Sequence, residues 1–208
     1  MELVPTNKRG FVLAVSAPSG TGKTSLCDKL ARDFTYVVRS ISVTTRPMRT
    51  GEVSGSDYIF VSPEEFKERE TRNELIETAQ VFGNWYGTPK QPVMDAIDRG
   101  QVIVMDIDTE GALRIHKLMP KDCVLVFVLP PSFEELEKRL RARGKNAGDE
   151  LERRLKEAAR EVRESAAYHY YVANVSFDVA YENLRCIVEA ERSRVHRQSL
   201  DFIAKGSP

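Results

Sequence analysis

FVLAVSAPSGTGKTSLCDKL, residues 11–30, joins a short apolar run to an amphipathic pattern through a loop that contains two glycines. The run Phe11–Ser16 predicts a buried strand, because it is continuous, apolar and followed by turn-forming residues. From Lys23 onward the apolar residues recur at helical spacing, as at Leu26 and Leu30, and predict a helix. A strand, a flexible loop and a helix in this order are typical of a layered α/β domain with a parallel sheet.

The same alternation continues along the chain. Residues 36–41 predict the next strand, and two apolar runs, Val102–Asp106 and Cys123–Leu129, predict further strands with a helix over Thr109–Leu118 between them. Strands that alternate with helices form a parallel sheet whose faces the helices cover. We therefore predict an α/β fold with a parallel sheet core flanked by helices.

Two regions depart from this pattern. Residues 44–89 combine a turn-rich stretch, an alternating YIFV at 58–61, a helix over 63–72 and a strand over 75–82, which predicts a mixed α/β insertion. After two prolines the chain becomes charged and helical over 133–143 and 149–167, with a glycine at each end of the interruption at 144–148. A strand over 171–173 and a helix over 179–196 complete the pattern. The predicted division is core at 1–42, 91–132 and 166–208, insertion at 43–90, and lid with flanking helices at 133–165.

Composition limits the classes of partner. The 31 Lys and Arg balance 31 Asp and Glu, which argues against wrapping of nucleic acid or binding to a membrane surface through a basic field. No segment approaches the ~18 consecutive apolar residues of a membrane helix. The three cysteines, Cys27, Cys123 and Cys186, are widely spaced and predict buried thiols in a reducing compartment. We therefore expect a cytoplasmic protein that binds small molecules, and leave open whether it forms a homo-oligomer.

The loop at residues 17–24, APSGTGKT, fits the pattern GxxxxGK[ST] at every position except the first, where Ala17 stands. In such a loop the backbone N–H groups converge on phosphate oxygens, Lys23 reaches the outer phosphates and the Thr24 hydroxyl can hold Mg²⁺. The alternative is a glycine-rich turn with a chance GKT. The flanking strand and helix favour the phosphate loop.

Asp106 ends the strand VIVMD, where its carboxylate would stand beside the loop at the edge of the sheet. It could support Mg²⁺ through water. Alternatively, it could cap the following helix, although Asp108 is nearer to that helix and fits this role better.

Polar residues gather in two further groups. Arginines are dense on both sides of the interruption at 144–148, where guanidinium groups could neutralise a transferring phosphoryl group or, alternatively, pair with interleaved glutamates on a solvated helix. In the insertion, two arginines, two tyrosines, a carboxylate and hydroxyls could hold a monophosphate and bind the edge of a base, although each alone fits a surface position. These insertion residues are Ser42, Arg46, Arg49, Tyr58, Glu77, Tyr86 and Thr88.

From about residue 11 to residue 197 the chain resembles the guanylate kinases. The similar segments are SAPSGTGKT at 16–24, SVTTRPMRTGEVSGSDYIFV at 42–61, ELIETAQVFGNWYGT at 74–88, DIDTEGA at 106–112 and KRLRARG at 138–144. The resemblance implies a P-loop nucleoside monophosphate kinase fold with an inserted GMP-binding domain and a helical lid. It also implies transfer of the γ-phosphoryl group of ATP to GMP with Mg²⁺, for guanine nucleotide recycling and GTP supply.

The resemblance also implies roles by position. Guanine would be bound by Ser42, Glu77 and Asp108, with Thr88 near them, and the GMP phosphate by Arg46, Arg49, Tyr58 and Tyr86. ATP would contact Ala17, Pro18, Ser19, Gly20, Thr21, Gly22, Lys23, Thr24, Ser25 and, near the adenine, Asn174. Mg²⁺ would lie near Thr24 and Asp106. The residues acting on the reacting phosphates would be Lys23, Arg46 and the lid arginines Arg139, Arg143 and Arg154.

Some positions depart from the family pattern. Ala17 replaces a glycine, Glu110 stands where the family usually has Gln, Thr88 replaces a Ser, and Val175 follows Asn174 where the family usually has Asp. Two alternatives remain beside a GMP kinase: a non-catalytic module that binds other proteins, and a kinase for another phosphorylated acceptor. The presence of Lys23 argues against the first, and Glu77 with Ser42 and Asp108 argues against the second.

Overall fold

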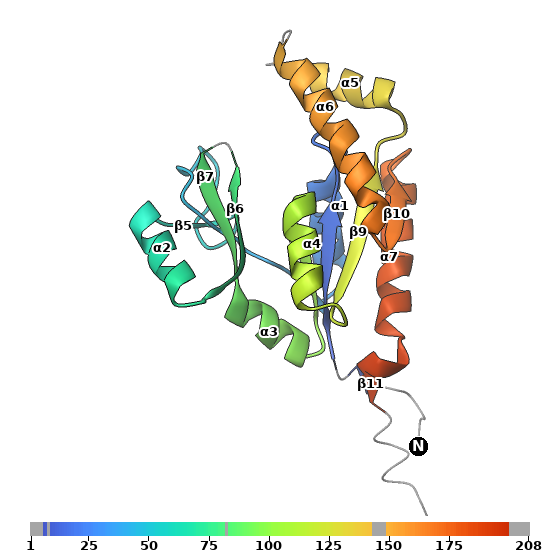
Figure 1. Cartoon of the computed structure of the whole chain (residues 1–208). Coiled ribbons are helices and arrows are strands. Elements are labelled where there is room, and N and C mark those ends of the chain that lie inside the picture. Colours follow the sequence, from blue (N-terminus) through green and yellow to red (C-terminus); the bar gives the residue numbers. More distant parts are fainter. Residues whose placement is uncertain (1–5, 8, 82, 143–148, 200–208) are drawn as a thin grey trace, which may run out of the picture.

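Five parallel strands form the central sheet of the computed structural model, which describes residues 6–7, 9–81, 83–142 and 149–199 (Figure 1). The strand order is β10-β9-β2-β8-β3. In that order the strands span Tyr170–Ala173, Cys123–Leu129, Phe11–Ser16, Val102–Asp106 and Val37–Arg39. The central strand β2 is buried along its whole length, as its continuous apolar run predicts.

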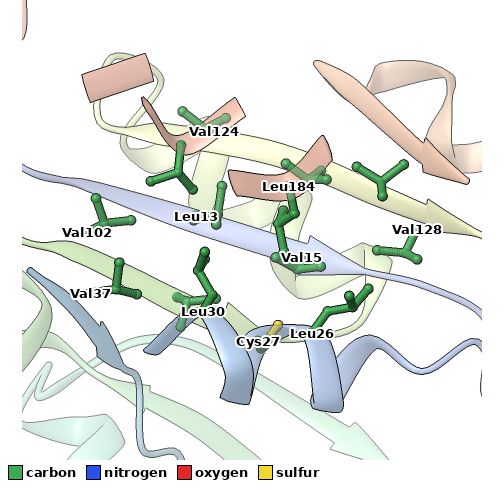
Figure 2. Packing of buried hydrophobic residues seen from close by; sticks show 14 of the residues in the cluster. Leu13, Val15, Leu26, Cys27, Leu30, Val37, Val102, Val124, Val128 and Leu184 are labelled. Carbon is green, nitrogen blue, oxygen red and sulfur yellow. The ribbon is translucent and has the colours of Figure 1, made fainter. Parts of the chain in front are cut away.

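Both faces of this sheet are covered by helices. Phe11, Leu13 and Val15 of β2 pack into a cluster with α1 (Lys23–Asp33) and α7 (Phe177–Arg192), which Figure 2 shows in part. The alternate residues Val12 and Ala14 pack on the other face with α3 (Lys90–Asp98) and α4 (Thr109–Leu118). Because successive side chains of a strand point to opposite faces, one apolar strand contributes to both halves of the core.

The register of the sheet brings its polar residues together. Val15 pairs with Asp106 of β8, and Ser16 pairs with Phe127 of β9. The loop that follows β2 and the carboxylate that ends β8 are therefore neighbours at one edge. In parallel α/β sheets, ligands bind outside this edge, at the carboxyl ends of the strands.

The insertion contains a second sheet in the order β5-β4-β7-β6. Its strands span Ile59–Phe60, Val43–Thr44, Asn84–Pro89 and Leu75–Val81, and the helix α2 spans Pro63–Thr71. The pairing of β6 with β7 shifts between Leu75 and Thr78, so one strand carries an extra residue there. A bulge of this kind redirects the side chains next to it.

Two charged helices lie beyond the carboxyl ends of the core strands (Figure 1). These helices, α5 (Phe133–Ala142) and α6 (Asp149–Glu164), pack on each other through a small apolar cluster of Leu136, Leu140, Leu151 and Ala158. A 3₁₀ turn, Ser165–Ala167, follows α6. At the opposite end of the sheet, β1 (Thr6–Asn7) pairs with β11 (Gln198–Ser199).

The strands over 102–106 and 123–129 and the helix over 109–118 match their predictions. The helix predicted over 179–196 instead begins at Phe177 and ends at Arg192, because residues 195–197 form a 3₁₀ turn. That turn buries the guanidinium of Arg197. The guanidinium donates to the carbonyl of Gly10, just before β2, and to that of Lys121, just before β9. The strand at 84–89 and the helix at 90–98 had no counterpart in the sequence prediction.

The prediction of three buried cysteines is wrong for Cys186, which is exposed on α7, while Cys27 and Cys123 are buried. Position 186 lies on the outer side of α7, whereas Leu184 and Val188 face the core. Burial raises the pKa of both inner thiols to about 12. In the described part of the chain, none of the helices has the length and apolar character needed to cross a bilayer.

Candidate active site

A cleft of about 520 Å³ opens at the carboxyl ends of the core strands. The loop after β2, the insertion, the turn between β8 and α4, and helix α6 all line it. Its lining residues are Ala17, Pro18, Ser19, Gly20, Thr21, Gly22, Lys23, Thr24, Ser25, Ser42, Tyr58, Glu77, Ala79, Val81, Tyr86, Asp106, Ile107, Asp108 and Glu161. Every residue of the predicted phosphate loop faces this one space.

The loop conformation depends on its glycines. Gly20 and Gly22 both have φ of +92°, a region that other residues rarely adopt. A Cβ atom on Gly22 would also lie 2.9 Å from Nδ2 of Asn174. That amide donates a 2.6 Å hydrogen bond to the carbonyl of Thr21, so Asn174 holds the loop from β10. Contact of Asn174 with adenine stays a prediction.

Lys23, the first residue of α1, reaches across the cleft edge to β8. Its ammonium lies 2.8 Å from Oδ1 of Asp106 and donates to the carbonyl of Ile107 at 2.9 Å. The Thr24 hydroxyl donates to the other oxygen of Asp106. Burial acts to raise the pKa of Asp106, but the charge of Lys23 and these hydrogen bonds outweigh it and lower the pKa below its ordinary value. The carboxylate is therefore ionised at neutral pH.

Thr24 and Asp106 have the chemistry of a magnesium site. Mg²⁺ prefers oxygen ligands and is commonly held by one or two protein oxygens together with substrate phosphates and water. A hydroxyl and an ionised carboxylate in direct contact at the mouth of a phosphate loop fit that requirement. Among the described residues no group of three or more His, Cys, Asp and Glu could hold a metal without such substrate oxygens.

Five residues predicted to bind the acceptor line the same cleft, although they are far apart in the sequence. They are Ser42, Tyr58, Glu77, Tyr86 and Asp108. The rings of Tyr58 and Tyr86 stand edge to face, with centroids 6.0 Å apart. Burial raises the pKa of Tyr58, so its hydroxyl keeps its proton and can donate to a phosphate oxygen.

Glu77 is a buried carboxylate at the bulge of β6, where 8% of the residue is exposed. Its Oε1 accepts a 2.9 Å hydrogen bond from the hydroxyl of Thr88. Thr88 is buried as well and supports Glu77 rather than lining the cleft. Burial raises the pKa of Glu77, while Thr88 and Arg114 act in the opposite direction.

Asp108 has two roles in the structure. As predicted, it caps α4, because its Oδ1 accepts a 2.7 Å hydrogen bond from the N–H of Gly111. It also lines the cleft. A Cβ atom on Gly111 would lie 2.8 Å from the side chain of Ile107 and 3.1 Å from Oδ1 of Asp108, so glycine allows this tight cap.

Glu52, which the sequence analysis did not select, forms hydrogen bonds with both Arg46 and Arg49. Its carboxylate accepts from both Nη atoms of Arg46, at 3.1 and 2.8 Å, and from the N–H of Arg49 at 2.8 Å. The Arg46 guanidinium also lies 5.3 Å from the centre of the Tyr58 ring. Neither arginine lines the described cleft, and their phosphate contacts remain a prediction.

The predicted lid arginines lie on α5 and α6. Arg139 bonds to Glu135 and Arg154 bonds to Glu150, each within its own helix at 3.0 Å. Neither is among the lining residues of the described cleft. Arg143 and the interruption at 144–148 fall outside the described residues.

Glu161 of α6 is a cleft residue that the sequence analysis missed. Burial raises its pKa to about 7, although the charge of Lys23 opposes this shift. Helical spacing offered an indication, because Leu151 and Ala158 are buried and Glu161 follows three residues after Ala158 on the same side. Within a helix so rich in charge, that spacing alone did not distinguish Glu161 from its solvated neighbours.

Comparisons with known proteins agree with this architecture. The family model of the guanylate kinases matches residues 9–191. A guanylate kinase of Caulobacter vibrioides is 45% identical over 184 residues, which are 88% of this chain and 86% of the relative. A guanylate kinase of Hydrogenovibrio crunogenus is 43% identical over 189 residues, 91% of this chain and 92% of the relative.

Agreement extends to three dimensions. The crystal structure of guanylate kinase from Anaplasma phagocytophilum superposes with a TM-score of 0.76 at 36% sequence identity, and covers 92% of this chain and 90% of that chain. With nearly the whole sequence matched and the phosphate loop, the insertion and the cleft in place, this chain belongs to the guanylate kinase family.

Proposed function

We propose that this protein is an ATP:GMP phosphotransferase, which transfers the γ-phosphoryl group of ATP to GMP and forms ADP and GDP. Membership of the guanylate kinase family supports this function. The observation that carries it is the cleft, which is lined by Lys23 and Thr24 together with Ser42, Glu77 and Asp108. A site for a nucleotide phosphate and a site for a base edge therefore share one space.

The polar groups on the acceptor side suit guanine. Guanine presents N1–H and the N2 amine as donors and O6 as an acceptor. A Glu77 carboxylate can accept from the two donors, and the hydroxyl of Ser42 can donate to O6. Adenine presents an acceptor at N1 and an amine at position 6, so it would leave the buried carboxylate without a partner.

Catalysis in this cleft needs positioning and neutralisation of charge rather than a dedicated base. Lys23, which forms an ion pair with Asp106, would move its ammonium to the outer phosphates of ATP. Mg²⁺, held near Thr24 and Asp106, would neutralise phosphate charge. Arg139, Arg143 and Arg154 would approach the reacting phosphates when α5 and α6 close over the cleft, and water would be excluded.

A coupled assay of ADP formation with ATP and each of GMP, AMP, UMP and CMP tests the function. We expect kcat/KM for GMP to exceed that for AMP by about 10⁴ or more, as for sites built on hydrogen bonds. Lys23→Ala should lower kcat with GMP by on the order of a hundredfold or more. Lys29→Ala, on the same helix and paired with Asp33, is the matched control and should remain active.

The assay also separates the alternatives. Comparable kcat/KM for GMP and AMP would exclude the guanine site and leave a phosphate-loop kinase of another acceptor. Absence of ADP formation with all four nucleotides, in a protein that melts cooperatively, would favour a non-catalytic module.

A further inference from the structure

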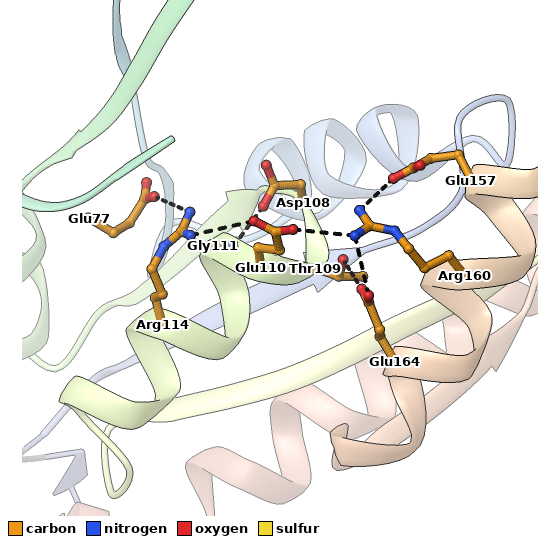
Figure 3. Close-up of polar contacts among 9 residues, drawn as sticks. All are labelled: Glu77, Asp108, Thr109, Glu110, Gly111, Arg114, Glu157, Arg160 and Glu164. Carbon is orange, nitrogen blue, oxygen red and sulfur yellow. Dashed lines mark hydrogen bonds and ion pairs between the residues drawn. The ribbon is translucent and has the colours of Figure 1, made fainter. Parts of the chain in front are cut away.

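Arg114 lies behind the carboxylate that we assign to guanine. It belongs to α4 of the core and extends toward β6 of the insertion, as Figure 3 shows. Its Nη2 lies 3.5 Å from Oε2 of Glu77, and its Nη1 lies 3.7 Å from Oε2 of Glu110. Arg114 is not among the residues that line the described cleft. It therefore contacts the residue that binds the base, and not the space that the base would occupy.

Glu77 needs such a partner. Thr88 satisfies Oε1, but Oε2 is buried and has no hydrogen-bond partner among the described residues. A buried carboxylate that lacks a compensating charge takes up a proton instead of remaining ionised. The guanidinium of Arg114 is the cation that forms an ion pair with Oε2, so it supplies that compensation from the side away from the cleft.

We propose that Arg114 is a positioning residue of the acceptor site, which keeps the Glu77 carboxylate ionised and directed toward the cleft before guanine enters. This inference rests on the proposed function, because it takes Glu77 as the acceptor of the guanine N1–H and N2 amine. It adds a residue from the core to the recognition of the base by the insertion. Specificity for GMP would then depend on the contact between these two parts of the chain.

Glu110 provides a second carboxylate close to the guanidinium of Arg114. The family usually has Gln there, whereas this chain has a carboxylate one helical turn before Arg114. Nε and Nη2 of Arg114 are buried without hydrogen-bond partners among the described residues, although 40% of the side chain is exposed, so the two carboxylates balance the charge of its buried part. Glu110 also lies 3.5 Å from Arg160 of α6, which continues the row of charges shown in Figure 3.

The groups around Glu77 define how its protonation should respond. Two groups on α4 or at its N-cap act on the pKa of Glu77: Arg114 lowers it and Asp108 raises it. Glu110, also on α4, contacts Arg114. On β7, the hydroxyl of Thr88 lowers the pKa of Glu77. Tyr86, also on β7, lines the same cleft as Glu77. From α2, Glu70 accepts a hydrogen bond from Thr78, the next residue along β6. Removal of Arg114 leaves burial and Asp108 with less opposition, so Glu77 should take up a proton at higher pH.

Steady-state kinetics of Arg114→Gln across pH 5 to 9 test the proposal. We expect KM for GMP to rise by on the order of tenfold with a much smaller change in kcat, because the lost interaction acts on binding of the acceptor. The acid limb of kcat/KM for GMP should move to higher pH by about one unit. Arg114→Lys should restore most of both effects, since it returns the positive charge.

Two further variants make the test specific. Arg160→Gln breaks ion pairs to Glu110 and Glu164 in the same network but does not touch Glu77, so it is the matched control and should leave the acid limb in place. In a Glu77→Gln background, Arg114→Gln should have little additional effect on KM for GMP. Such non-additivity is the mark of two residues that act through one interaction.

The outcomes separate this inference from the proposed function. If the unmodified protein phosphorylates GMP and Arg114→Gln leaves KM and the acid limb unchanged, the positioning role is wrong while the function stands. Equal effects of Arg114→Gln in the parent and Glu77→Gln backgrounds would overturn it too, as would an equal shift from Arg160→Gln. A loss of thermal stability in Arg114→Gln does not alter the test, because Arg114→Lys and the pH profile remain informative.

Discussion

At the scale of the residue, the site is a set of carboxylates in contrasting environments. Asp106 is partly buried but is held ionised by Lys23 and Thr24. Glu77 is buried and has weaker compensation, so its pKa is raised. Glu161 lines the same cleft and has a pKa raised to about 7. Groups of one chemical type thus differ in pKa because their neighbours differ.

Glu161 gives a prediction about stability and pH. Its pKa rises from an ordinary value of 4.5 to about 7 in the folded protein, so the folded state binds this proton more tightly than the unfolded chain. The resulting stabilisation is complete below about pH 4.5 and is lost as pH rises through about 7. Glu161→Gln should therefore raise Tm at pH 8 relative to the parent protein and leave it nearly unchanged at pH 4.5.

Thermal melts at these two pH values measure the effect. Glu152→Gln is the control, because Glu152 is exposed on the same helix, where it pairs with Lys156. A Tm difference for Glu161→Gln that is the same at both pH values would show that folding does not raise the pKa of Glu161.

At the scale of the element, α5 and α6 carry arginines that form ion pairs with glutamates of the same helix. Arg139 bonds to Glu135 and Arg141 bonds to Glu137, at the same spacing along α5. The side chain of Arg139 is 30% exposed, and that of Arg141 is 63% exposed. Ion pairs at such exposed positions are weak, so a phosphate can replace the glutamate at small cost.

The two arginines therefore form a matched pair for mutation. If Arg139 meets the phosphates only after closure, Arg139→Ala should lower kcat by on the order of tenfold or more, with a smaller effect on KM for GMP. Arg141→Ala should change neither constant appreciably. A rise in KM for GMP alone would instead place Arg139 at the acceptor site.

At the scale of the whole molecule, the cleft is lined by residues of the insertion, the core and α6. The insertion is covalently continuous with the core through residues 40–42 and through α3, and α4 packs against β6. Arg139 and Arg154 do not line the described cleft in this arrangement. Transfer of a phosphoryl group in a water-poor site would require these parts to approach one another.

Small-angle X-ray scattering can measure this approach. We expect the radius of gyration to fall when GMP and a non-hydrolysable ATP analogue are both bound, because each nucleotide contacts two parts of the molecule. AMP in place of GMP should give a smaller change, since it cannot satisfy Glu77. An unchanged radius of gyration at saturating GMP and ATP analogue would indicate that the lid does not close as a body.

The sequence by itself determined the central sheet and the phosphate loop. Strands such as Val102–Asp106 and Cys123–Leu129 are continuous apolar runs bounded by polar residues, so local pattern alone locates their ends. Gly20, Gly22 and Lys23 also form a local pattern, whose chemistry is readable without knowledge of the fold. The resemblance to the guanylate kinases then assigned roles to the candidate acceptor residues of the insertion, each of which alone also fits a surface position.

Only the tertiary structure decided how the acceptor side is supported. Glu52 holds Arg46, Thr88 and Arg114 hold Glu77, and Glu161 turns into the cleft. Periodicity detects apolar faces, but an ion pair between segments such as β6 and α4 depends on their packing and on the bulge near Glu77. From the sequence alone, a charged residue fits equally well a position in solvent or a position in an ion pair. Its environment, and hence its pKa, exists only once distant parts of the chain are brought together.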